Sequence, residues 1–114
     1  MNEIANRSSW NSSPLPAQRE KLSIERTFSE EEYNCLSRGW IPEGMDDKWF
    51  IFMEKDNLHF HRSWTGFCIY EVYFDDERAI RETWVNRDSE QYTQTNGKND
   101  ENLLMILIDR QITS

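Results

Sequence analysis

Long hydrophobic runs are missing from this sequence of 114 residues. No apolar stretch approaches the about 18 residues that a membrane-spanning helix requires. The first residues, MNEIANRSSWNSSPLP, also lack the apolar centre of a secretory signal. We therefore expect a cytoplasmic protein that has no membrane partner.

Cysteine is equally scarce, because Cys35 and Cys68 are the only two in the chain. They fall on different expected elements and form no CxxC pair or His/Cys ligand spacing. This pattern disfavours both a disulfide framework and a zinc site, and reduced thiols suit a cytoplasmic protein. The sequence therefore predicts no metal site and no cofactor.

Positive charge is in the minority, since 13 Lys and Arg residues stand against 21 Asp and Glu residues and the net charge is -8. Such a chain repels a phosphate backbone, so polymeric nucleic acid is excluded as the expected partner. A small anionic ligand remains compatible, because local cations such as Arg62, Arg81 and Arg87 can dominate one pocket.

Aromatic residues, by contrast, are frequent, and each of the five tryptophans can bury a large area while keeping an N–H donor. Most aromatic residues and both histidines fall within residues 45–74. Residues 1–22 are rich in Asn, Ser and Pro without a hydrophobic period, which predicts a mobile N-terminal arm. Residues 23–114 have the size of one domain.

Hydrophobic patterns predict two helices and four strands. Ser29 and Glu32 form a capping box, which starts a helix that ends before Gly39. An apolar stripe predicts a second helix over 102–112. The connections are too short for parallel crossovers, so we expect an α+β fold: a four-stranded antiparallel meander with one helix before it and one after it. The expected strands are 48–54, 58–63, 67–74 and 79–87.

The two histidines, His59 and His61, share one face of the second expected strand. Two imidazoles at this spacing can reach one metal ion. Asp46, Asp47 or Glu71 could supply a third ligand, but nothing in the spacing selects one of them. We therefore interpret the histidines as a structural or ligand-facing pair.

The run HRSWTG, residues 61–66, is the densest cluster of chemically useful side chains. It combines a guanidinium, hydroxyl groups, an indole and a glycine that lets a ligand approach the backbone. Proteins hold nucleotides by stacking on an aromatic ring beside a guanidinium. The alternative is a hairpin turn in which Trp64 only caps the core. A nucleophilic pair of Ser63 and His61 is weaker, because no nucleophile elbow or oxyanion loop accompanies it.

The run GMDDKWFIFMEKDNLHFHRSWTGFCIY, followed by WVNRDSEQYTQTN, resembles a small bacterial and phage domain. The resemblance covers roughly residues 28–108 and is most specific in DDKWFIF, FHRSWTG and VNRD. That domain occurs alone or attached to ADP-ribosylglycohydrolase or macro-type proteins. The resemblance implies chemistry around ADP-ribose or a related nucleotide, and it carries over no catalytic residues.

We therefore expect a non-catalytic binding module for a small nucleotide-derived ligand of the ADP-ribose or cyclic ADP-ribose type, which sequesters a signal in phage-bacterium conflict. An indole would stack on the base, and Arg or His side chains would bind phosphate or ribose. One alternative is a protein-interaction module that buries the same aromatic residues in a homo-oligomer. Another is a hydrolase of an ADP-ribose bond that uses Asp46 and His61. The predicted ligand-binding residues are His61, Arg62, Ser63, Trp64, Thr65, Trp49, Trp84, Arg87 and Asp46.

The most specific expectation concerns the side chain of Arg62. It continues the apolar strand face of Leu58 and Phe60, so its guanidinium needs an anion at the end of the strand. If a ligand phosphate is that anion, Arg62→Ala should abolish binding and leave the fold nearly as stable. If Asp46 or Glu71 is the anion, the same change should lower the melting temperature.

Overall fold

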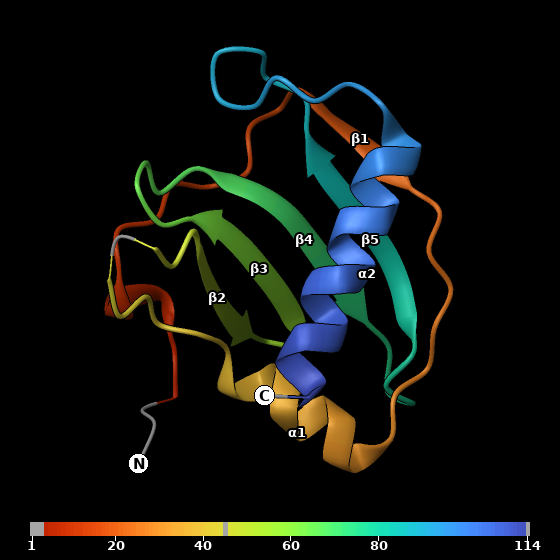
Figure 1. Ribbon diagram of the computed structural model, residues 1–114. Coiled ribbons are helices and arrows are strands. Elements are labelled where there is room, and N and C mark those ends of the chain that lie inside the picture. The colour runs from red at the N-terminus through yellow and green to blue at the C-terminus, as the bar shows by residue number, and fades with distance from the viewer. Residues whose placement is uncertain (1–3, 45, 114) are drawn as a thin grey trace.

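The protein is built on one antiparallel sheet with two α-helices, and the α+β class is confirmed. The computed structural model describes residues 4–44 and 46–113. Figure 1 shows α2 in front of the sheet and α1 at its lower end. The strands follow the order β1-β5-β4-β3-β2. In chain order the elements are the 3-10 helix η1 (Arg7–Ser9), β1 (Arg19–Leu22), α1 (Glu30–Arg38), β2 (Trp49–Glu54), β3 (Asn57–Arg62), β4 (Cys68–Phe74), β5 (Ile80–Asn86) and α2 (Gly97–Thr113).

α2 covers one face of the sheet and α1 packs against α2 at the lower end (Figure 1); we call this face the helix face. The capping box predicted for α1 is present, because Ser29 Oγ accepts from the Glu32 amide and the Glu32 carboxylate accepts from the Ser29 amide. α2 begins earlier than expected, since Asn96 Oδ1 accepts from the amides of Lys98 and Asn99 and so caps the first turn. Its buried apolar residues are Leu104, Leu107 and Ile108.

The sheet has one strand more than the predicted meander. β1 pairs antiparallel with β5, from Arg19 opposite Asn86 to Leu22 opposite Thr83. Leu22 is the one buried residue of β1, so this edge strand lacks the alternating pattern by which strands are recognised. Because β1 precedes α1, that helix stands before the four-stranded meander but not before the whole sheet.

The N-terminal residues belong to the domain, which corrects the arm expected over residues 1–22. Residues 4–16 lie against the face of the sheet opposite the helices, which we call the second face. There Ala5 is 1% exposed and packs with Phe50 and Phe52. The Ala5 amide donates to the carbonyl of Arg38 at 2.8 Å. A boundary at residue 22 is therefore wrong for residues 4–22, while residues 1–3 lie outside the described residues.

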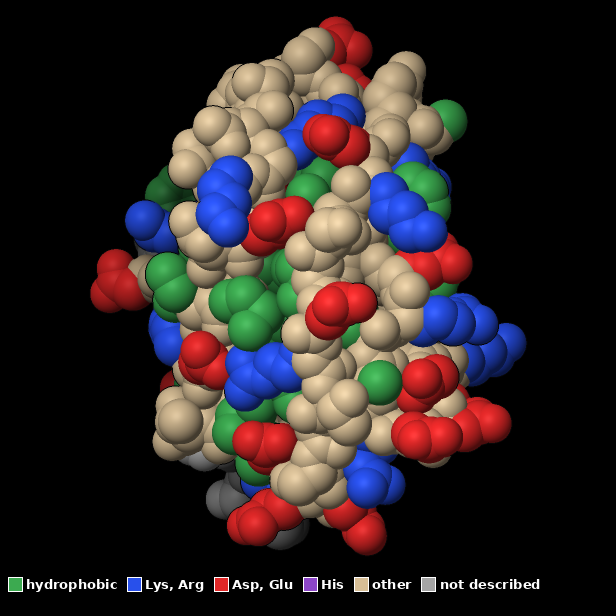
Figure 2. All heavy atoms as spheres, turned by 90° about the vertical axis from the view of Figure 1, so that its right-hand side faces the viewer, with side chains coloured by type: hydrophobic (Ala, Val, Ile, Leu, Met, Phe, Trp, Pro, Cys, Tyr) green, Lys and Arg blue, Asp and Glu red, His purple; other side chains and the backbone are tan. Residues whose placement is uncertain are grey.

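Charges of both signs are mixed on the side of the molecule near β1 and α2. Figure 2 shows this side, where Lys and Arg (blue) alternate with Asp and Glu (red) and hydrophobic side chains form small separate areas. One ion pair, Arg26 to Asp109 at 2.8 Å, ties the segment before α1 to α2. Among the described residues, no helix is long and apolar enough to cross a membrane.

Candidate functional site

Two central residues of the predicted site, His61 and Arg62, lie on opposite faces of the sheet because they are consecutive residues of β3. His61 lies on the second face, is 1% exposed, and donates from Nδ1 to the carbonyl of Gly66 at 2.9 Å. Burial lowers the pKa of His61 to about 4, so its ring is neutral at pH 7. Arg62 lies on the helix face, where it borders an open hollow. The sheet therefore separates these two side chains.

The two hydroxyl groups of the turn after β3 form hydrogen bonds within the chain. Ser63 Oγ donates to the backbone carbonyl of Asp47. Thr65 Oγ1 accepts from the amide of Phe67 at 3.2 Å. Trp64 is 70% exposed within the same turn. These contacts favour the hairpin-turn interpretation for Ser63 and Thr65, but the exposed Trp64 does not cap the core as that interpretation expected.

Trp49 and Arg62 form a stacked pair on the helix face. They are register partners across β2 and β3, and the guanidinium carbon lies 4.5 Å from the centroid of the Trp49 ring. Tyr70 stacks on the same indole with centroids 6.0 Å apart, and Trp49 is 9% exposed. Among the described residues, neither Asp46 nor Glu71 forms the expected ion pair with Arg62. The indole face thus compensates part of the lost hydration of Arg62.

Trp84 and Arg87 lie at β5, which β4 separates from β3. The Trp84 indole donates to Glu82 at 2.7 Å. Arg87 forms ion pairs with Glu20 at 2.6 Å and with Asp100 at 2.7 Å. Both predicted ligand-binding residues are therefore engaged within the chain, and the structure does not gather them beside the turn after β3.

A groove with a volume of about 380 Å³ opens between the loop leading into β2 and the C-terminal part of α2. We call it the β2–α2 groove. Trp40 is fixed beside β2 because its amide donates to the Ile51 carbonyl at 2.8 Å and its carbonyl accepts from the Ile51 amide at 3.0 Å. The groove is lined by Trp40, Asp46, Asp47, Lys48, Trp49, Ile51, Leu107, Arg110 and Gln111.

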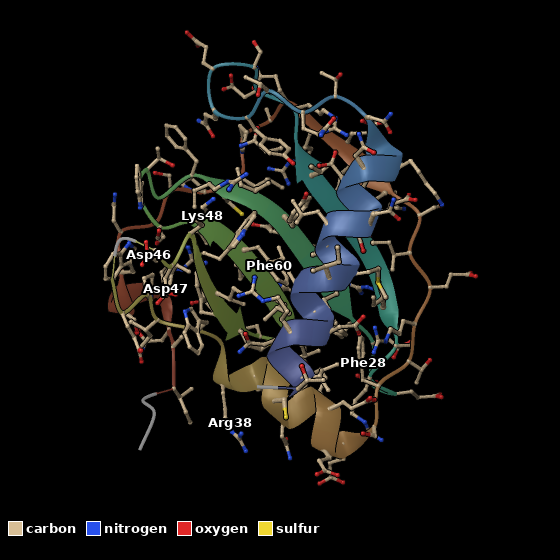
Figure 3. The ribbon with its side chains drawn as sticks, viewed as in Figure 1. Phe28, Arg38, Asp46, Asp47, Lys48 and Phe60 are labelled. Atoms are coloured by element: carbon tan, nitrogen blue, oxygen red, sulfur yellow. The ribbon has the colours of Figure 1, made fainter. Side chains whose placement is uncertain are left out.

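Asp46 and Trp49 are the predicted ligand-binding residues that line this groove. Figure 3 shows Asp46, Asp47 and Lys48 together in the loop that leads into β2. Asp47 is held in place, since its Oδ2 accepts from the Glu43 amide at 2.7 Å. Asp46 and Lys48 are exposed. The loop therefore presents both a carboxylate and an amine to the groove.

Seven of the nine described lining residues were not predicted as ligand-binding from the sequence, and four of these seven are Trp40, Lys48, Arg110 and Gln111. One signal was available for the last two. Leu107 and Gln111 are separated by about one helical turn, so a helix that docks through Leu107 brings Gln111 to the same side. Trp40 and Lys48 had no such signal, because their place depends on the path of the loop between α1 and β2.

Arg62 borders a second hollow, which is more open than the groove and has a volume of about 590 Å³. We call it the loop hollow, because most of its lining comes from the loop between β5 and α2. Arg62 is its one cationic lining residue, and Tyr92 is its aromatic one. The other lining residues are Ser89, Glu90, Gln91, Thr93, Gln94 and Leu103.

Among the described residues, both hollows are lined by groups that can bind a ligand, and no histidine lines either of them. The nucleophilic pair considered from the sequence is not joined, because Ser63 donates to Asp47 and His61 to Gly66. The β2–α2 groove offers indole surface, cations and carboxylates. Comparison of the chain with known protein families, curated proteins and solved structures finds no match.

Proposed function

We propose that the chain is a non-catalytic binding module for a small nucleotide-derived ligand of the ADP-ribose or cyclic ADP-ribose type, held in the β2–α2 groove. One observation carries the proposal: two tryptophans, two cations and two carboxylates line a single hollow. Its volume of about 380 Å³ falls within the range of roughly 300–1,000 Å³ that small-molecule sites occupy.

Each group in the groove has a role that its exposure allows. Trp40 is half-buried and supplies the indole surface for a base, because Trp49 is 9% exposed and already stacks with Tyr70. Lys48 and Arg110 are exposed cations and bind phosphate oxygens. The carboxylates repel phosphate and instead accept hydrogen bonds from ribose hydroxyl groups.

The resemblance described above supports the choice of ADP-ribose among the small anions that such a groove could hold. Sequestration of a signal in phage-bacterium conflict is proposed from the same resemblance. In this proposal the protein lowers the concentration of the ligand by holding it without converting it.

Calorimetric titration with ADP-ribose, cyclic ADP-ribose and a cyclic dinucleotide tests the proposal. We expect saturable binding of at least one of them, weakened about tenfold or more by Arg110→Ala or Lys48→Ala because each removes a charge-assisted contact. Arg38→Ala is the matched control, since Arg38 is exposed at the end of α1 and points away from the groove in Figure 3. This control should bind like the wild type.

The same titration separates the groove from the loop hollow and from other functions. Loss of binding in Arg62→Ala, together with normal binding in Arg110→Ala, would indicate that the ligand binds in the loop hollow. Flat isotherms for all three ligands would refute the proposal. Flat isotherms together with self-association in light scattering would favour the protein-interaction module, and a released product would favour the hydrolase.

A further inference from the structure

Three side chains with metal-ligating atoms converge on the second face. His59, His61 and Cys68 each offer one such atom, and these atoms lie within 4.8 Å of one another. The three residues are 7%, 1% and 0% exposed. They belong to adjacent strands, because His61 is the register partner of Cys68 across β3 and β4. This cluster is separate from both hollows on the helix face.

A β-bulge brings the cysteine into this cluster. Phe60 pairs with Tyr70, so a regular ladder would place Ile69 opposite His61. The register shifts at this point, and Cys68 stands opposite His61 instead. Residue spacing alone selects no third ligand for the histidine pair, because spacing does not reveal a bulge.

His61 is oriented as a metal-binding histidine is. Its Nδ1 lies 2.9 Å from the carbonyl oxygen of Gly66, which can only accept a hydrogen bond, so Nδ1 carries the proton. Nε2 then holds a lone pair. This atom is buried and has no hydrogen-bond partner among the described residues. A buried acceptor without a partner costs stability, and a bound metal ion would satisfy it.

His59 has the outer partner that commonly accompanies metal-ligating histidines. Its Nδ1 lies 3.2 Å from Oε2 of Glu71, which is 9% exposed. Tyr73 donates to the other carboxylate oxygen at 2.9 Å and holds Glu71 in place. A carboxylate behind the imidazole fixes the ring and directs Nε2 toward the metal position.

We propose that His59, His61 and Cys68 bind one thiophilic transition-metal ion, of the zinc or copper class, beneath the N-terminal segment of residues 4–16. Two imidazoles and a thiolate select such an ion over Mg²⁺ or Ca²⁺. For a divalent ion such as Zn²⁺ the charges also balance, because the ion displaces the proton of the Cys68 thiol into solvent and then faces the thiolate and the Glu71 carboxylate in a buried place. Ligand atoms around zinc lie roughly 3.5 Å apart, so the three side chains approach one another by about 1 Å on binding.

Titration of the chelator-treated, full-length protein with Co²⁺ tests this site, because a cobalt–thiolate bond gives its own absorption band. We expect the band to saturate at a single equivalent and to disappear when Zn²⁺ or Cu⁺ is added in competition. Zn²⁺ should also raise the melting temperature, since it binds the folded chain in preference to the unfolded one. The preference between zinc and copper is read from the competition.

Cys68→Ser and Cys35→Ser form a matched pair, because Cys35 is the other thiol and lies on α1, outside the cluster. Cys68→Ser should remove the band and Cys35→Ser should retain it. Glu71→Gln should weaken Co²⁺ binding by about 10–100-fold while the thiolate band remains at saturation. If Cys68→Ser does not fold, the Co²⁺ affinity of Glu71→Gln tests the site instead. A wild-type titration without a thiolate band, or a band lost in Cys35→Ser alone, would overturn the site.

Discussion

The indole nitrogen of Trp10 donates a hydrogen bond to the backbone carbonyl of Ser63 at 2.7 Å. The amide of Ser13 donates to the Gly66 carbonyl at 2.8 Å, and that same carbonyl accepts from His61. The N-terminal segment is therefore joined to both ends of the turn after β3. Docking of this segment and the orientation of His61 depend on the same short piece of backbone.

Trp10→Phe should loosen the N-terminal segment, because it removes the indole donor and keeps an aromatic ring. We expect a loss of about 1 kcal/mol in the free energy of unfolding, typical of one hydrogen bond. Hydrogen exchange of the amides in residues 4–15 should become faster. Ile4→Ala is the control, since Ile4 is 63% exposed. Unchanged exchange in Trp10→Phe would show that this bond does not hold the segment.

Local signals predicted the elements that are defined by residues close together in the chain. The capping box of Ser29 and Glu32 gave the start of α1, and Gly39 gave its end. Short apolar runs bounded by turn residues predicted β2 to β5 within a few residues of their bounds. In these segments the residues that form the element are also those that determine its ends.

Contacts between distant parts of the chain could not be predicted. β1 exists because β5 pairs with it, and the strand itself buries only Leu22. Ala5 carries too little apolar surface to mark a core position, yet it is buried against Phe50 and Phe52. Of the candidate site, Asp46 and Trp49 were predicted, whereas Arg110 was missed because the groove joins segments on two different elements.

Gly39→Ala should be strongly destabilising. Gly39 has φ of 65°, and a Cβ atom there would clash with the carbonyl oxygen of Ile51. That oxygen accepts the Trp40 amide, so the neighbouring backbone cannot move away without loss of a hydrogen bond. We expect a loss of at least about 2 kcal/mol in urea unfolding.

Gly44→Ala is the matched control for this prediction, because a Cβ atom at Gly44 would meet nothing within 4 Å. Its stability should remain within about 0.5 kcal/mol of the wild type or rise slightly, since alanine restricts the unfolded chain. Equal effects of the two substitutions would contradict the role assigned to the conformation of Gly39.

Asp100 is the centre of a buried hydrogen-bond network, so Asp100→Ala should strongly lower the free energy of unfolding. Its carboxylate is 1% exposed and accepts from Tyr70 at 2.9 Å, from Tyr92 at 2.6 Å and from Arg87 at 2.7 Å. Removal of the carboxylate leaves these buried donors without their acceptor. We expect the free energy of unfolding in urea to fall by about 3–5 kcal/mol. Asp109→Ala removes the half-exposed ion pair with Arg26 and should cost less than about 1 kcal/mol. Similar losses in the two variants would refute the central role of Asp100.

Tyr92 gives the protein an alkaline limit of stability. Burial, followed by the hydrogen bond to Asp100, raises the pKa of Tyr92 from 10.0 to about 12. The unfolded chain loses this proton first, so the stabilisation is fully present below pH 10 and is lost as pH rises through about 12. Urea midpoints measured from about pH 9 to about pH 12 should therefore fall more steeply in the wild type than in Tyr92→Phe. The difference should stay well below about 1.4 kcal/mol per pH unit, because Tyr92 is partly solvated. Tyr92→Phe also removes a hydrogen bond that helps to raise the pKa of Tyr70, so a difference between the curves reports on both tyrosines. Parallel curves would show that Tyr92 keeps an ordinary pKa.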